Sequence, residues 1–162
     1  EQARISPMRM QQSQLPGGVL VLNDAYNANP TSMLAALDTL VALRRQTPTA
    51  RLVAVLGDML ELGTLEAAAH HRLGEQVAEL GIDRLFVCGV RAEAIAAGAR
   101  ARMGEGRVLH TLEPGEIARG LDGWLEPGDI VLIKGSRGAR MERVLEALQR
   151  LRGVESAPQG AH

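Results

Sequence analysis

The sequence predicts an α/β fold in which helices cover both faces of a mainly parallel sheet of about six strands. From Val19 onward, short apolar runs alternate with longer segments of helical spacing, a pattern typical of stacked βα units. The runs at 53–56 and 130–133 contain no alternating polar residues, which indicates strands buried on both faces. The expected architecture is therefore Rossmann-like and doubly wound.

Parallel strands and helices are expected in strict alternation. The strands are the apolar runs at 19–23, 51–56, 84–88, 107–110 and 129–134. The helices follow at 31–45, 64–80, 91–102, 115–125 and 139–151. The first and last helices each have an apolar face that should pack on the sheet, formed by Met33, Leu37, Leu40 and Val41 and by Met141, Val144, Leu145 and Leu148.

The two ends of the chain have a different character. Residues 9–15 alternate loosely and are joined to the first strand by Pro16-Gly17-Gly18, which predicts an antiparallel edge strand. Residues 153–162 show no periodicity, and we expect a frayed tail there. We therefore expect one domain over residues 1–152, with 1–17 as linker and edge strand.

Composition narrows the class of protein. A length of 162 residues suits one domain with its own core, and a net charge of -1 argues against nucleic acid or an anionic membrane as partner. The lone Cys88 excludes a disulfide framework, and no stretch approaches the ~20 apolar residues that span a bilayer, so the cytoplasm is expected. Aromatic residues make up only 2% of the chain, which favours a monomer because aromatic side chains dominate stable interfaces.

Polar residues cluster where the first strand should end, at the sheet edge where α/β proteins bind ligands. Asn29 suits a helix N-cap and Pro30 suits the first helical turn, so local structure explains both residues. Asp24, Tyr26 and Asn27 add a carboxylate, a phenol and an amide that could bind ribose hydroxyls or stack on a base. From spacing alone, the structural and the ligand-binding interpretations are equally supported.

The second strand should end at Gly57, followed by Asp58. A carboxylate at a helix start explains Asp58 more often than a ligand or cation does. His70 and His71 lie on the following helix, where adjacent side chains point about 100° apart and cannot easily bind one metal ion. No metal site is therefore expected.

The last strand should end in Lys134-Gly135-Ser136-Arg137. Lys134 is the only lysine among 18 basic residues, which suggests a specific need for a compact ammonium group. Ser136 offers a hydroxyl, and Arg137 offers a fork that matches a carboxylate or a phosphate. These residues predict an anion-binding loop, although a strand-to-helix turn capped by Ser136 is the structural alternative.

Several catalytic motifs are missing. The sequence contains no G-x-x-x-x-G-K-[ST] phosphate loop and no G-x-G-x-x-G dinucleotide motif. It also lacks a G-x-S-x-G elbow, an H-E-x-x-H motif and the Cys/His spacing of a zinc site. The chain alone therefore supplies no nucleotide triphosphate cradle, and hydrolase or metalloprotease activity is not expected.

Three strings, taken together, resemble the C-terminal domain of the Mur ligases. They are the residues at 24–33 (D-A-Y-N-A-N-P-x-S-M), at 57–63 (G-D-M-x-E-L-G) and at 134–137 (K-G-S-R), the last followed by Met141-Glu142. The resemblance runs from about Arg9 to Leu151. Within the family it is strongest to the ligase that adds D-alanyl-D-alanine to UDP-N-acetylmuramoyl-tripeptide in peptidoglycan precursor synthesis.

The resemblance implies a third domain that closes over a central ATPase domain. ATP and Mg2+ would be held mainly by the central domain, and the UDP-sugar by an N-terminal domain, neither of which is in this chain. In the family, ATP activates the peptide carboxylate as an acyl phosphate, which the amine of D-alanyl-D-alanine then attacks. This chain alone would be inactive.

The resemblance also implies roles for single residues. The loop residues Asp24, Tyr26, Asn27 and Asn29 would face the nucleotide. The later loop, with Lys134, Ser136 and Arg137, would face the D-alanyl-D-alanine carboxylate or the acyl phosphate, where a cationic loop stabilises growing negative charge. Behind these residues would lie Asp58 and one of His70 and His71. No catalytic base can be named in this chain.

Three other functions stay open at this point. The chain could be the equivalent domain of another ligase of the superfamily, such as the folylpolyglutamate type. It could be a stand-alone binding module, or a generic nucleotide-binding domain. The amino substrate accepted by the complete enzyme separates the first case from the ligase above. A native gene that encodes only this stretch would indicate the binding module, and ADP affinity without any effect of D-alanyl-D-alanine on the complete enzyme would indicate the generic domain.

Overall fold

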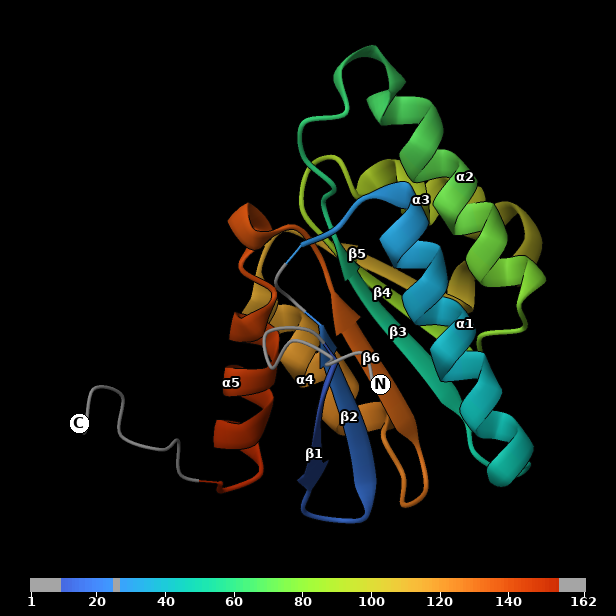
Figure 1. Ribbon diagram of the computed structural model, residues 1–162. Helices are drawn as coiled ribbons and strands as arrows, with labels where there is room; N and C mark the ends of the chain where they lie inside the picture. The colour runs from blue at the N-terminus through green and yellow to red at the C-terminus, as the bar shows by residue number, and fades with distance from the viewer. Residues whose placement is uncertain (1–9, 25–26, 155–162) are drawn as a thin grey trace, which may run out of the picture.

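A six-stranded sheet forms the middle layer of the molecule, in the order β1-β2-β6-β3-β4-β5 (Figure 1). The structure is a computed structural model that describes residues 10–24 and 27–154. The strands are β1 (Gln11–Leu15), β2 (Val19–Asp24), β3 (Leu52–Gly57), β4 (Arg84–Cys88), β5 (Val108–Thr111) and β6 (Ile130–Lys134). All neighbouring pairs within the described residues are parallel except β1 and β2, which are antiparallel.

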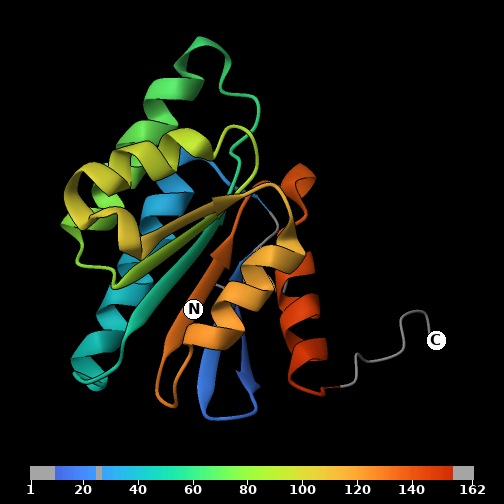
Figure 2. The same ribbon diagram turned by 180° about the vertical axis from the view of Figure 1, so that it is seen from behind.

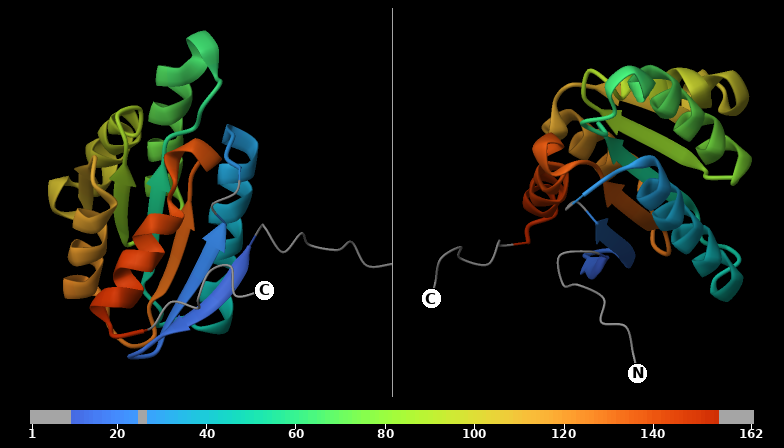
Figure 3. Two further views of the ribbon diagram at one scale, coloured as in Figure 1. Left: turned by 90° about the vertical axis from the view of Figure 1, so that its left-hand side faces the viewer. Right: turned by 45° about the horizontal axis from the view of Figure 1, so that its top comes forward.

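Helices cover both faces of this sheet, as Figures 2 and 3 show from other sides. One face is covered by α1 (Pro30–Gln46), α2 (Glu66–Glu79) and α3 (Glu93–Met103), and the other by α4 (Pro114–Trp124) and α5 (Glu142–Leu151). Short 3-10 turns are η1 (Gly63–Leu65), η2 (Glu105–Arg107) and η3 (Arg137–Ala139). The predicted doubly wound, mainly parallel α/β fold is confirmed.

The central strands are apolar because they supply two cores at once. Along β3, Ala54 and Leu56 belong to the core under α1 to α3, whereas Val53 and Val55 belong to the core under α4 and α5. All six residues of β3 are buried. Each large apolar side chain buried in this way contributes about 1.5–3 kcal/mol relative to exposure.

The expected antiparallel edge strand is present. Strand β1 pairs with β2 from Gln11 opposite Asn23 to Leu15 opposite Val19. Gly17 and Gly18 in the connecting turn have φ values of 97° and 80°, which favour glycine because a side chain clashes in this region. Residues 1–9 of the expected linker and 155–162 of the expected tail lie outside the described residues.

Three helices start two or three residues later than expected, and α3 is one of them, since it starts at Glu93 instead of residue 91. The expected helix at 64–80 begins with η1 and becomes α-helical only from Glu66. The expected helix at 139–151 begins as α5 at Glu142, because Arg140 adopts the left-handed conformation with φ 54° and interrupts the turn after η3. On α1, Val41 is only partly buried, and Ala36 joins Met33 in the core instead.

Helices α2 and α3 approach each other closely enough to exclude side chains. A Cβ atom on Gly74 would lie 2.0 Å from the carbonyl oxygen of Ile95, and one on Gly98 would lie 2.1 Å from that of His71. Only glycine permits this contact. No helix among the described residues is both long and apolar enough to cross a membrane.

Candidate functional site

The sheet brings the three sequence strings to one edge. Strands β2, β6 and β3 are parallel neighbours, so their carboxyl ends lie side by side (Figure 1). Asp24 pairs in register with Lys134, and Lys134 pairs with Leu56 of β3. Loops at this edge of a parallel sheet are where α/β proteins bind ligands.

Lys134 is buried at this edge, and its ammonium group is bound by the protein itself. Its Nζ atom donates to Oδ2 of Asp24 at 3.0 Å and to the backbone oxygen of Asn27 at 2.7 Å. Only 2% of the side chain is exposed. Lys134 and Asp24, predicted to bind substrate and nucleotide respectively, are thus a buried ion pair in this structure.

Ser136 connects β6 to the loop after β3. Its backbone N–H donates to the oxygen of Asp58 at 2.9 Å, and its Oγ accepts from the N–H of Leu60 at 2.9 Å. Ser136 is buried. The hydroxyl that was predicted to bind an anion therefore accepts a backbone hydrogen bond and fixes the neighbouring loop.

Asp58 and His70 also fix the loop after β3, through contacts with α2 and with the residues before α3. Oδ1 of Asp58 accepts from the N–H of Ala92 at 2.8 Å, and Oδ2 lies 3.6 Å from Nη1 of Arg91. His70 is buried, its Nε2 accepts from the N–H of Met59 at 2.9 Å, and its Nδ1 lies 2.7 Å from the backbone oxygen of Glu66. Since Nε2 accepts, Nδ1 carries the proton and donates.

The remaining predicted site residues are exposed or not described. Asn27 and Arg137 are exposed at the carboxyl edge, whereas His71 is exposed on α2 with Nδ1 4.0 Å from Glu75. His71 therefore does not join the cluster formed by the buried residues. Tyr26 lies outside the described residues.

Asn29 is the N-cap of α1, as local structure predicted. Its Oδ1 accepts from the N–H of Ser32 at 2.8 Å, and the Ser32 hydroxyl accepts from the N–H of Asn29 at 3.0 Å, which forms a capping box.

We expect Asn29→Ala to lower the free energy of unfolding by about 1 kcal/mol, because one helix-start N–H loses its partner. Urea denaturation of Asn29→Ala beside Thr31→Ala measures this; equal losses in the two variants would contradict the capping role.

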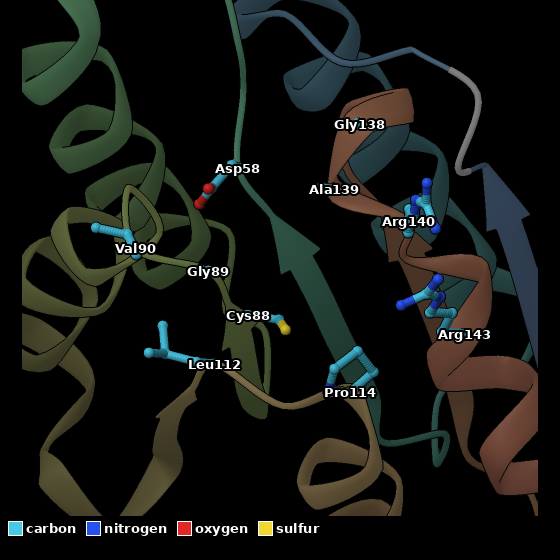
Figure 4. Close-up of a pocket in the computed structure, with 10 residues that line it drawn as sticks. All are labelled: Asp58, Cys88, Gly89, Val90, Leu112, Pro114, Gly138, Ala139, Arg140 and Arg143. Carbon is cyan, nitrogen blue, oxygen red and sulfur yellow. The ribbon is translucent and has the colours of Figure 1, made fainter.

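A cleft of about 370 Å³ opens at the carboxyl edge, between the loops after β3, β4 and β5 and the start of α5 (Figure 4). Arg140 and Arg143 lie on its α5 side, opposite the apolar side chains of Val90 and Leu112. Within residues 10–24 and 27–154, neither arginine forms an ion pair. The cleft therefore offers two guanidinium groups and an apolar wall, which suits a small ligand with an anionic group.

Sequence reasoning did not find Arg140 and Arg143. Both follow the K-G-S-R string and look like ordinary surface arginines of a helix. Arg140 is placed by its left-handed backbone, and no glycine or asparagine marks that position in the sequence. The signal that could have found them was their short distance in sequence from the end of β6.

Cys88 lines the same cleft and is buried. Burial, with smaller contributions from Asp58 and Glu113, raises its pKa to about 11 from 9.0. We expect slow labelling by iodoacetamide at pH 8, because the thiolate is the nucleophile.

The raised pKa of Cys88 also contributes to the free energy of unfolding. This contribution is fully present below pH 9 and is lost as pH rises through about 11. Cys88→Ala should remove that part of the pH dependence of stability in urea titrations; an unchanged slope would contradict it.

A divalent metal ion has no ready-made site in the described part of the chain. No group of three or more His, Cys, Asp or Glu side chains there could hold one. Asp58 is the only carboxylate that lines the cleft, and Arg91 and Ala92 already bind it.

Comparison with known proteins decides the family. The family model described as "Mur ligase, glutamate ligase domain" matches residues 8–137. The chain belongs to the Mur ligase family. It is 35% identical over 145 residues to the UDP-N-acetylmuramoyl-tripeptide–D-alanyl-D-alanine ligase of Bacillus subtilis, a match that covers 90% of this chain and 31% of that protein.

Solved Mur ligases share the fold. The MurF ligase of Thermotoga maritima, crystallised in complex with ADP, superposes with a TM-score of 0.76 at 30% identity, over 91% of this chain and 32% of that one. A single domain of a related ligase from Haemophilus ducreyi was solved on its own. It matches over 99% of its length with a TM-score of 0.61 at 20% identity, so the two domains share the fold. This chain thus corresponds to the C-terminal domain of a Mur ligase and spans about a third of the length of the full-length relatives that it matches.

Proposed function

We propose that residues 1–152 form the C-terminal domain of an ATP-dependent ligase that adds D-alanyl-D-alanine to UDP-N-acetylmuramoyl-tripeptide in the cytoplasm. The observation that carries the proposal is the 35% identity to such a ligase along 90% of this chain. The domain alone is inactive, because ATP, Mg2+ and the sugar nucleotide are held mainly by the rest of the enzyme. The whole reaction needs the longer protein.

The carboxyl-edge cleft supports a role in binding the incoming amino substrate. D-Alanyl-D-alanine has one carboxylate and two methyl groups, which match the guanidinium groups of Arg140 and Arg143 and the apolar wall at Val90 and Leu112. Arg137 is exposed and directly precedes Gly138, which lines the cleft. A charged hydrogen bond of this kind contributes about 1.5–3 kcal/mol.

The exposed residues of the loop after β2 support a second contact. Asn27 is exposed at the same edge, beside the N-terminus of α1. Its exposed amide group can bind ribose hydroxyls or phosphate oxygens, so this residue suits the nucleotide side of the proposed active site. Tyr26 would belong to this contact as well.

Titration of the 15N-labelled chain with D-alanyl-D-alanine tests the binding role. We expect amide shifts to concentrate at 57–63, 88–91 and 135–143, and to be clearly larger than with L-alanyl-L-alanine, the matched enantiomer. Arg143→Gln should weaken binding about tenfold or more, because a charged hydrogen bond is lost. Equal shifts with both enantiomers, or shifts confined to the far side of α1 and α2, would contradict the assignment of the cleft.

A further inference from the structure

The ammonium group of Lys134 is enclosed by protein and does not face the cleft. Two of its three N–H donors are used, by Oδ2 of Asp24 and by the backbone oxygen of Asn27. Its side chain is 2% exposed, and Lys134 is not among the residues that line the cleft. A substrate carboxylate could reach the third N–H only if the protein around this buried ion pair opened.

The two acceptors lie at both ends of one short loop. Asp24 is the last residue of β2 and stands directly opposite Lys134 in the parallel register. Asn27 lies three residues on, just before the N-cap Asn29 of α1. A single ammonium group thus fixes the exit of β2 and the approach to α1, which includes the exposed side chain of Asn27.

The residues at the end of β6 also bind the loop after β3, through hydrogen bonds of Ser136. Two residues after Lys134, Ser136 donates to the oxygen of Asp58 and accepts from the N–H of Leu60. Buried polar groups that are fully bonded fix one arrangement of the backbone, because any other arrangement leaves them unpaired. The β6 tip therefore fixes the loops after β2 and β3 together.

We propose that Lys134 is a positioning residue, which ties Asp24 at the end of β2 to Asn27 just before α1 and does not itself bind substrate. Hydrogen exchange of this chain tests the positioning role without any assumption about function. Steady-state kinetics of the complete enzyme rests on the proposed ligase function, so a failure of the function and a failure of the positioning role can be told apart.

Hydrogen exchange of the isolated chain tests the loop directly. The reporters are the amides of Asn29, Ser32 and Met33, which are hydrogen-bonded at the start of α1. In Lys134→Met these amides should exchange at least about tenfold faster, while those of Phe86 and Val87 in β4 stay within about twofold of wild type. Unchanged exchange at the three reporters would overturn the proposal.

Two further variants keep the exchange test decisive. Arg150→Met, which removes an exposed cation outside both the loop and the cleft, is the matched control and should leave the reporters unchanged. If Lys134→Met does not fold, Asp24→Asn replaces it, because it removes the charge partner but keeps the size of the side chain. Asp24→Asn should speed exchange at the same reporters, and Lys134→Met/Asp24→Asn should add little, since both act on one ion pair. Additive effects would count against a shared role.

Steady-state kinetics of the complete ligase separates positioning from direct contact. Wild type and Lys134→Met are compared on D-alanyl-D-alanine and on its C-terminal amide, which lacks the carboxylate charge. If Lys134 positions the loop, the substitution lowers kcat/KM for the acid and the amide by the same factor. If Lys134 binds the carboxylate, it lowers kcat/KM for the acid much more than for the amide, and the proposal fails.

Discussion

Gly74→Ala is expected to lower the free energy of unfolding by about 2–3 kcal/mol, although alanine is the better helix former. The new Cβ atom would lie 2.0 Å from the carbonyl oxygen of Ile95 and 2.8 Å from the nitrogen of Ala99. Backbone atoms cannot rotate away, so α2 and α3 must separate. Thermal and urea denaturation measure the loss.

Gly123→Ala is the matched control for this prediction. Gly123 also lies within a helix, α4, but a Cβ atom there would meet nothing within 4 Å. Its replacement should leave stability unchanged or raise it by about 0.5–1 kcal/mol, since alanine loses less backbone entropy. A Gly74→Ala variant as stable as Gly123→Ala would show that the close contact of α2 and α3 does not limit stability.

Arg137→Ala in the complete ligase is expected to lower kcat/KM for D-alanyl-D-alanine about 10²-fold, the usual effect of removing one group that stabilises developing negative charge. Arg137 is exposed and stands between the buried Ser136 and Gly138, which lines the cleft. Because it is exposed, its loss should leave the melting temperature nearly unchanged.

Arg150→Ala provides the comparison for Arg137→Ala. Arg150 is an exposed arginine in the last turn of α5 and does not line the cleft. It should retain wild-type kinetics. Wild-type turnover in Arg137→Ala, measured beside it, would remove Arg137 from the site.

The order of strands and helices could be predicted because it depends on local patterns. Unbroken apolar runs such as 130–133 mark strands buried on two faces, and Pro16-Gly17-Gly18 marks a turn that needs positive φ. The start of α5 could not be predicted in the same way. The left-handed Arg140 that delays it carries no signal in its residue type.

The candidate site was predicted in position but not in detail. Sequence reasoning placed Asp24, Asp58 and Lys134 at one sheet edge, and the structure brings them there. It could not tell that Lys134 and Ser136 point into the protein, because a charged residue at a strand end looks the same whether it binds a ligand or a neighbouring loop. That distinction depends on partners more than 70 residues away in sequence, such as Asp24 for Lys134 and Leu60 for Ser136.

The most direct test of the central claim is the amide product formed by the complete gene product that contains this chain. The enzyme is given ATP, Mg2+ and UDP-N-acetylmuramoyl-tripeptide with D-alanyl-D-alanine, and separately a folate acceptor with L-glutamate. We predict an amide product, with ADP and phosphate, only from the sugar peptide and D-alanyl-D-alanine. L-Glutamate addition to the folate acceptor, or a gene product that forms neither amide, would contradict the account.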